Sequence, residues 1–326
     1  MSTSKTKLAV VIPCFRAGER VLKVLAALDK DVDLVFLIDD ACPDKTGRLV
    51  EQACLDKRVR VLYHEENQGV GGAMVTGYKA ALAAGADIVV KLDADGQMDP
   101  SLIATLVAPI RQGRADYVKG NRFHRVSDVA SMPRLRLIGN AVLSFLTKLS
   151  SGYWQVFDPT NGFTAVHRAA LLQVDLDKLA KRYFFESDML YHLNMARAVV
   201  SEMPMKAVYG DEPSSLRPLA MVRPFLLGHL RNMARRIAYS YFLRGFSVAS
   251  LELLLGPPLL LAGALFGAVQ WYASISSGLP ATAGSVMLAA LPVLLGVQLV
   301  LSWLHFDIAA EPRVPVQSLM PNSPGR

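Results

Sequence analysis

Two apolar stretches in the C-terminal third constrain the fold of this chain more than any other feature. Residues 253–273 and 283–304 contain no charged side chain, and each has the roughly 20 residues that a helix needs to cross a bilayer. A buried hairpin in a large soluble core is the alternative, but no other part of the sequence could cover it. We therefore predict a two-helix transmembrane hairpin over residues 247–306.

Basic residues precede these stretches and indicate how they meet the membrane. Residues 224–245 have the pattern of an amphipathic helix, and we expect the segment 221–246 to lie in the membrane interface. Its surroundings are rich in arginine: Arg217, Arg223, Arg231, Arg235, Arg236 and Arg244. Of these, Arg231, Arg235 and Arg236 are expected off the apolar face of the helix.

The distribution of positive charge also predicts an orientation. Arg244 and Arg313 flank the outer ends of the hairpin, whereas its connector carries no charge. By the positive-inside rule both ends face the cytosol and the connector faces out. The cytosolic tail over residues 307–326 is rich in proline from Glu311 onward, so no regular structure is expected there.

Residues 1–220 have a different character, because strand-like and helix-like segments alternate along them. Strands are expected at 7–15, 32–40, 59–66 and 86–95, with helices between them, so this part should be an α/β domain with a mostly parallel sheet and helices on both faces. The first residues lack the apolar core of a signal peptide, and three scattered cysteines indicate a reducing compartment. We place this domain on the cytosolic face of the inner (cytoplasmic) membrane. A net charge of +7 then suits an anionic membrane better than nucleic acid.

Acidic residues gather where the fourth expected strand ends, in KLDADGQMDP (91–100). Residues at i and i+2 of a strand point to one side, so Asp93 and Asp95 could approach one hard cation, with Gln97 adding a neutral oxygen. Mg²⁺ and Mn²⁺ take such oxygen ligands and share them with diphosphate. The alternative is a solvated turn in which Asp99 caps the next helix.

Other strand ends carry candidate ligands as well. Asp39 and Asp40 end the second strand and could accept hydrogen bonds from a nucleobase or ribose. The alternative is a turn over 39–47 with Asp44 as a helix cap. The glycines of NQGVGGAMVTG (67–77) suggest a dinucleotide site, but Met74 stands where a third small residue is needed, and the segment follows the third strand.

Later segments offer phosphate ligands and further acids. Arg122, Arg134 and Arg136 flank a loop, expected at 124–134, and could bind phosphate, although ordinary surface roles are the alternative. The turn DPTNGF (158–163) and the helix start FFESD (184–188) place Asp158, Glu186 and Asp188 where structural roles are also common.

Taken in order, these segments resemble glycosyltransferase family 2, and above all its polyprenyl-phosphate branch, which is similar to dolichol-phosphate mannose synthases. The stretches that carry the resemblance are VVIPCF, FLIDDACPDKT, NQGVGGAMVTGYKAAL, KLDADGQMDP, GNRF, DPTNGF and FFESD, within residues 7–215. The resemblance implies a GT-A fold, a nucleoside diphosphate sugar as donor and a polyprenyl phosphate as acceptor.

The resemblance also implies roles for individual residues. Catalytic groups would be Asp95, Asp158, Glu186 and Arg122. Donor-nucleotide contacts would come from Pro13, Phe15, Asp39, Asp40 and Asp93. The acceptor phosphate would meet Arg122, Arg136 and Asn140, and Mg²⁺ or Mn²⁺ would be held by Asp93, Asp95 and Gln97.

Some positions depart from the family pattern. The family's Tyr-Asn-Glu is replaced by Phe15, Arg16 and Ala17, with Glu19 as a substitute acid, and a frequent arginine after GF is Thr164. These changes concern the identity of the sugar more than the reaction. A Q-x-x-R-W stretch is absent from the sequence, which argues against a processive polysaccharide synthase.

The leading hypothesis is a metal-dependent, inverting hexosyltransferase that moves one sugar to a polyprenyl phosphate. One alternative acceptor is another membrane lipid or a lipid-linked glycan, and such a hydroxyl acceptor would need a true base, for which Asp158 is the candidate. A decayed transferase that only binds nucleotide sugar is the non-enzymatic alternative. A homo-oligomer is left open.

Overall fold

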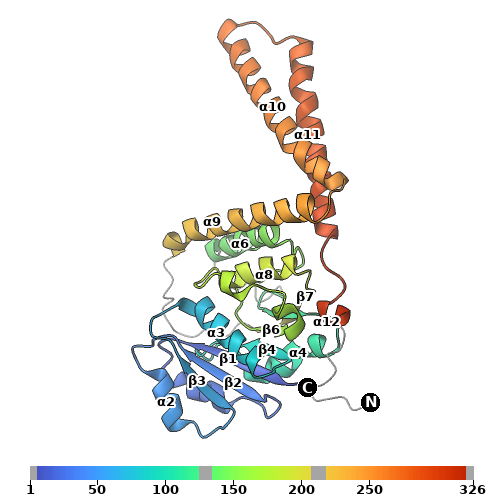
Figure 1. The fold of residues 1–326 in the computed structure, drawn as a ribbon. Coiled ribbons are helices and arrows are strands. Elements are labelled where there is room, and N and C mark those ends of the chain that lie inside the picture. Colours follow the sequence, from blue (N-terminus) through green and yellow to red (C-terminus); the bar gives the residue numbers. More distant parts are fainter. Residues whose placement is uncertain (1–5, 125–133, 207–217, 321–326) are drawn as a thin grey trace. The chain divides into compact units, whose positions relative to one another are not determined.

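The computed structural model describes residues 6–124, 134–206 and 218–320 (Figure 1). The chain packs into two compact units. The first comprises Met1–Met233 and Glu311–Arg326, and the second comprises Ala234–Ala310. The predicted loop at 124–134 lies almost wholly outside the described residues.

A sheet of seven strands forms the centre of the first unit. Its strands are β1 (Leu8–Cys14), β2 (Leu34–Asp39), β3 (Val59–Tyr63), β4 (Ile88–Lys91), β5 (Tyr117–Asn121), β6 (Thr164–His167) and β7 (Val200–Pro204), in the spatial order β3-β2-β1-β4-β6-β5-β7. Only β6 runs antiparallel to its neighbours, β4 and β5. The predicted mostly parallel sheet is therefore confirmed.

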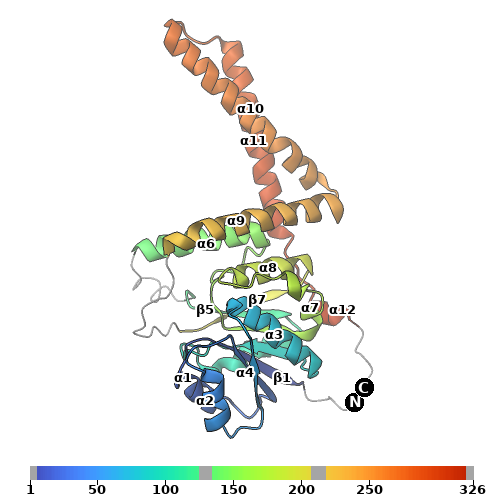
Figure 2. The ribbon, with the colours of Figure 1, turned by 60° about the vertical axis from the view of Figure 1, so that its left-hand side comes forward.

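Helices cover both faces of this sheet, as its two-sided apolar strands require. On one face, Val10 and Ile12 of β1 join a core with α1 (Arg20–Ala26), α2 (Thr46–Ala53) and α4 (Ile103–Arg111). On the other, Ala9 and Val11 of the same strand join α3 (Gly69–Ala83), α7 (Arg168–Leu171) and α8 (Phe185–Met195). Figure 2 shows α3 and α8 on one side of the strands and α1, α2 and α4 on the other.

Two longer helices also contribute to this unit. The helix α6 (Arg134–Ser151) and the first part of α9 (Pro218–Ile237) lie side by side, joined by a 2.8 Å hydrogen bond between Ser150 Oγ and His229 Nδ1. The buried side of α9 carries His229 and Asn232, whereas Leu226, Leu227 and Leu230 are exposed. The helix predicted here is present, and the leucines of its apolar face are exposed on the surface.

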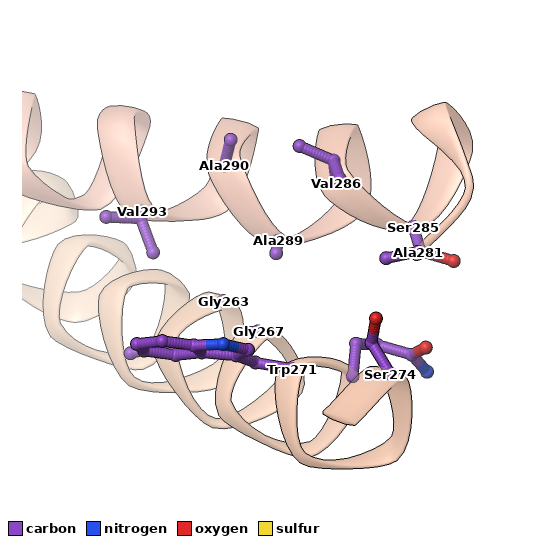
Figure 3. Close-up of a pocket in the computed structure, with 12 residues that line it drawn as sticks. Gly263, Gly267, Trp271, Ser274, Ala281, Ser285, Val286, Ala289, Ala290 and Val293 are labelled. Atoms are coloured by element: carbon purple, nitrogen blue, oxygen red, sulfur yellow. The ribbon is translucent and has the colours of Figure 1, made fainter. Parts of the chain in front are cut away.

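The second unit is dominated by two long helices, α10 (Val248–Ser277) and α11 (Ala283–Ala309). Both are long and apolar enough to cross a membrane, so the predicted hairpin is present as two candidate spans. They pack closely at small residues: an added Cβ at Gly296 would lie 2.5 Å from the Leu260 backbone nitrogen, and one at Gly263 would lie 2.9 Å from the Ala289 carbonyl oxygen. Towards the connector they separate and leave a pocket of about 440 Å³, in which Trp271 lies flat below Ala289 (Figure 3).

One arginine of this unit behaves differently from the prediction. Arg236 was expected off the apolar face of an interface helix, among exposed basic residues. Instead it is buried and forms two hydrogen bonds, of 2.6 and 3.0 Å, with the Asp307 carboxylate, which also accepts one of 2.6 Å from Tyr241. A charge buried so deeply needs such a partner, so Arg236 is part of the packing within this unit.

The segment after the hairpin contradicts the expectation of an unstructured tail. Glu311 accepts hydrogen bonds from the backbone N–H groups of Trp154 and Gln155, and a short helix follows, α12 (Val316–Leu319). Val316 is buried in the same core as α3 and α8. Sequence composition missed this because the partners of the segment lie far away in the sequence.

Asp116 anchors this returning segment. Its fully buried carboxylate accepts hydrogen bonds from the N–H groups of Val316 and Gln317, at 2.8 and 3.0 Å, and from that of Val199 at 2.8 Å. One acidic side chain thereby holds the tail against the start of β7.

Asp116→Ala should lower the free energy of unfolding by about 3 kcal/mol or more, because three buried N–H groups lose a charged acceptor. Denaturant unfolding in detergent, followed by tryptophan fluorescence, measures this change. Asp177→Ala is the matched control, since Asp177 is 77% exposed in its pair with Lys79 and should cost less than about 0.5 kcal/mol. Equal effects of the two substitutions would contradict the anchoring role.

Candidate active site

The acidic stretch 91–100 forms a turn beyond the end of β4. The strand ends at Lys91, so Asp93 and Asp95 do not share a strand face, and the predicted strand to residue 95 is too long. Ala94 between them is buried while both aspartates are partly open. Asp99 accepts a 2.9 Å hydrogen bond from the Ser101 N–H at the start of a 3₁₀ helix, Pro100–Leu102, which confirms its predicted capping role.

Asp93 and Asp95 each keep one carboxylate oxygen without a hydrogen bond among the described residues. The Oδ1 atom of Asp93 binds Lys91, and the Oδ1 atom of Asp95 accepts from the Gln97 N–H at 2.9 Å. Burial, joined by the neighbouring Asp93 carboxylate, raises the pKa of Asp95. Two open oxygens whose charges repel one another suit a hard divalent cation.

These donors alone would leave much of a cation's coordination shell open. In the described ranges, the structure gathers no group of three or more acidic, histidine or cysteine side chains suited to a metal ion. A cation at Asp93 and Asp95, with Gln97 close in sequence, would therefore take its remaining oxygens from water or a ligand. Phosphate oxygens suit Mg²⁺ in this role.

Lys91 joins the turn to helix α8. Its side chain is 2% exposed, and its Nζ atom lies 2.7 Å from Asp93 Oδ1 and 3.3 Å from Glu186 Oε1. Burial alone would lower the pKa of Lys91, but the two carboxylates outweigh it and raise that pKa. Glu186 is thereby brought to Asp93, as expected of a shared site. Lys91 was not identified from the sequence. The feature that could have identified it is a lysine at the end of an otherwise apolar strand.

A second ion pair lies in the turn 158–163. Asp158 is fully buried and receives two hydrogen bonds from the Arg122 guanidinium, at 2.8 and 2.9 Å, and one from the Arg122 N–H at 3.1 Å. Glu202 accepts from the N–H groups of Phe157 and Asp158 and from the Asn121 side chain. Two predicted site residues, Arg122 and Asp158, therefore contact one another directly.

A second buried lysine lies on the neighbouring part of the sheet. Lys119 of β5 is fully buried and donates a hydrogen bond to the Asn161 carbonyl oxygen. The sheet register places Thr164 opposite both Lys91 and Lys119. Burial lowers the pKa of Lys119 to about 8.

Lys119 should give the folding stability a pH dependence. Between pH 8 and about 10.4, the ordinary lysine pKa, the unfolded chain holds a proton that the folded chain has lost, so stability rises with pH. The free energy of unfolding of the wild type, minus that of Lys119→Met, should rise by up to about 3 kcal/mol across this window. Parallel curves for the two proteins would contradict the assignment.

Asp39 and Asp40 are both buried, and their carboxylates accept hydrogen bonds from backbone N–H groups. Asp39 accepts from the N–H groups of Cys42 and Gly47 at 2.7 Å each. The N-cap residue of α2 is Lys45, which makes no side-chain cap, so Asp39 receives the helix amide and Asp44 is not the cap that we predicted. Asp40 accepts from the N–H groups of Gln68 and Gly69 and binds His64.

The glycines at the start of α3 allow another backbone segment to approach the helix closely. An added Cβ at Gly69 would lie 2.7 Å from the Lys181 carbonyl oxygen, which also accepts a hydrogen bond from the Gly72 N–H. The backbone N–H groups at this helix start therefore donate to Asp40 and to the Lys181 carbonyl oxygen. These hydrogen bonds fasten the start of α3 to two other segments of the protein.

The remaining predicted residues lie on β1, in the segment after it, and on α6 and α8. Pro13 pairs with Ile38 in the register of β1 and β2, and Phe15, two residues later, is 46% exposed. Asn140 lies on α6, and the side chain of Arg136 lies outside the described residues. Asp188 accepts from the Ala180 N–H and the Asn232 side chain, which is a structural role.

The fold and site together define a class of protein. The order of the strands reverses between β1 and β4, and ligands of open α/β sheets bind beyond the strand ends at such a switch point. Pro13 and Asp39 lie at the carboxyl ends of β1 and β2, and Asp93 lies just beyond that of β4. This is an α/β domain whose switch point carries two open carboxylates, of Asp93 and Asp95, that suit a cation.

The chain belongs to glycosyl transferase family 2, whose sequence profile matches residues 9–174. It is 32% identical to a UDP-N-acetylglucosamine–dolichyl-phosphate N-acetylglucosaminyltransferase of Methanococcus voltae, over 62% of this chain and 86% of that protein. It is 29% identical to an undecaprenyl-phosphate mannosyltransferase of Micrococcus luteus, over 62% and 84% of the two chains. The predicted family is confirmed, and the protein is a glycosyltransferase.

A solved structure supports the same fold. Glucosyl-3-phosphoglycerate synthase from Mycobacterium tuberculosis, in complex with UDP, superposes with a TM-score of 0.53 at 20% identity, over 70% of this chain and 80% of that one. The GT-A-like α/β fold predicted from the sequence is thus present.

Proposed function

We propose that this protein transfers one sugar from a nucleoside diphosphate sugar to a polyprenyl phosphate, with inversion at the anomeric carbon. The observation that carries this proposal is the pair of open carboxylate oxygens on Asp93 and Asp95, at the switch point of a family 2 domain in a chain with two candidate membrane spans. Relatives named as dolichyl-phosphate and undecaprenyl-phosphate transferases support the acceptor class.

The chemistry asks little of a general base. A phosphate acceptor is already anionic near neutral pH, so its oxygen needs no deprotonation before it attacks. Mg²⁺ or Mn²⁺ at Asp93 and Asp95, when bound, would neutralise the departing diphosphate. The tight pair of Asp158 with Arg122 supports an orienting role for Asp158 rather than that of a base.

We assign the substrate contacts along the sheet edge. The nucleoside would be lined by Pro13, Phe15, Asp39 and Asp40. The carboxylates of Asp39 and Asp40 already bind backbone amides, so these two residues would act by holding the loops that line the nucleoside. Glu186 would face the sugar from the start of α8. Arg122, Arg136 and Asn140 would receive the acceptor phosphate.

Exposed apolar faces on the first unit support a membrane-facing surface. Ile138, Val142 and Phe145 of α6 are more than half exposed, as is Leu227 of α9. Together with the basic residues around α9, they suit the interface of an anionic bilayer. We propose a catalytic domain (1–220), an interface helix (221–246), a hairpin (247–306) and a tail (307–326) whose part from Glu311 onward packs with the catalytic domain.

The path of the chain supports the proposed orientation. Residues on both sides of the hairpin, up to Met233 and from Glu311, belong to the same compact unit. Both ends of the hairpin would then lie on the side of the catalytic domain, which the positive-inside rule places in the cytosol.

The decisive experiment incubates membranes containing the full-length protein with a panel of labelled nucleotide sugars and then extracts the lipid fraction. We expect label in a lipid whose sugar is released by mild acid, as a sugar phosphate is. Acid-stable lipid label would point to a hydroxyl acceptor instead. Binding of nucleotide sugar with neither transfer nor hydrolysis would overturn the assignment as an enzyme.

A further inference from the structure

Lys91 is a buried cation placed between two carboxylates of the candidate site. Its Nζ atom lies 2.7 Å from Asp93 Oδ1 in the turn after β4, and 3.3 Å from Glu186 Oε1 in the first turn of α8. One ammonium group thus joins two acidic residues that are far apart in the sequence.

The surroundings hold this ammonium group in place. An added Cβ at Gly162 would collide with Lys91 Nζ and would lie 2.7 Å from Asp93 Oδ2, so the turn 158–163 closes directly over the pair. A lysine buried to 2% exposure would be costly without partners, and it has little room to swing away. The interaction is therefore a fixed part of the site.

We infer that Lys91 is a positioning residue that sets how tightly the Asp93–Asp95 pair binds its divalent cation. The inference rests on the proposed function for the identity of the site. By engaging Asp93 Oδ1, Lys91 leaves only Oδ2 for a cation and places a like charge beside it. The free site then binds a cation weakly.

The charges around Lys91 explain why weak binding of a cation to the free site is useful. Asp93 and Glu186 place two negative charges beside the buried positive charge of Lys91, and Asp95 adds a third negative charge next to Asp93. Without the lysine, the Asp93 and Asp95 carboxylates would attract a cation more strongly, whether or not a donor is present. With it, tight binding requires the further negative charge of a diphosphate, so that cation and donor enter together.

The test measures Mn²⁺ binding to the purified full-length protein in detergent, from the electron paramagnetic resonance signal of free Mn²⁺. Lys91→Met removes the charge at similar length, and it should lower the dissociation constant for Mn²⁺ alone about tenfold. An unchanged or weaker affinity in this variant overturns the inference, as does the absence of binding by both proteins at millimolar Mn²⁺.

Two further variants separate the contact from general charge and from misfolding. Lys91→Gln keeps a hydrogen-bond donor near Asp93 without the charge, and it should also bind Mn²⁺ more tightly. Lys119→Met removes another buried lysine that forms no hydrogen bond with Asp93, so it should change the affinity much less. If Lys119→Met matches Lys91→Met, the effect is one of net charge and the inference fails.

The outcome can be separated from the fate of the proposed function. If the wild type labels the lipid fraction and Lys91→Met binds Mn²⁺ like the wild type, the inference alone fails. If no lipid is labelled while Lys91→Met binds Mn²⁺ more tightly, the role of Lys91 stands and the proposed acceptor is wrong.

Discussion

Asp95→Ala should abolish sugar transfer while the full-length protein remains folded in detergent. Asp95 contributes one of the two open carboxylate oxygens at the switch point, and removal of a group that stabilises developing charge typically costs 10²–10³-fold or more in rate, by order of magnitude. Transfer of labelled sugar into the lipid fraction measures the loss, and circular dichroism with thermal unfolding checks the fold.

The same turn offers a matched control. Asp99 is an exposed acid that caps a 3₁₀ helix, so Asp99→Ala should cost about 1 kcal/mol of stability and leave transfer near the wild-type rate. Ordinary turnover by Asp95→Ala would remove the cation hypothesis for this turn. Equal losses in both variants would mean that the shape of the turn, rather than the carboxylate of Asp95, is required.

Arg122→Ala should lower both stability and transfer strongly. It leaves the fully buried Asp158 carboxylate without its two guanidinium hydrogen bonds, and breaking a buried ion pair costs about 3–5 kcal/mol. Denaturant unfolding measures the first effect and lipid labelling the second. Lys79→Ala, which breaks an exposed pair with Asp177, should be nearly neutral.

A double substitution tests whether the charge of Asp158 is the cause. Asp158→Asn in the Arg122→Ala background removes the unpaired charge, so it should recover much of the lost stability. Asp158→Asn alone should keep measurable transfer if the residue only orients Arg122. Complete loss of transfer in a stable Asp158→Asn protein would make Asp158 the base of a hydroxyl acceptor.

The sequence was sufficient for those parts of the fold that local pattern determines. Apolar runs such as those of β1 and β2 marked the parallel sheet, and two uncharged stretches marked the candidate spans. The acids at strand ends also followed from the pattern, although β4 ends earlier than expected. Local spacing decides these features, so no distant contact was needed.

Features that depend on distant partners could not be predicted in this way. A lysine two residues from an acid in the sequence usually reaches solvent, whereas Lys91 contacts Glu186 and lies against Gly162, both far away in the sequence. The hydrogen bonds of Asp40 with His64 and with the start of α3 likewise join separate segments. Asp39 replaced Asp44 as the acceptor of the helix amide because the sheet places it there.

The returning tail has a consequence for biosynthesis. Val316 occupies a place in the core of the catalytic domain, and Asp116 binds the backbone around it, yet both spans precede this segment in the chain. A ribosome therefore makes the final piece of that core only after it has made the whole hairpin. The order of the chain alone therefore makes completion of this core follow the synthesis of both candidate spans.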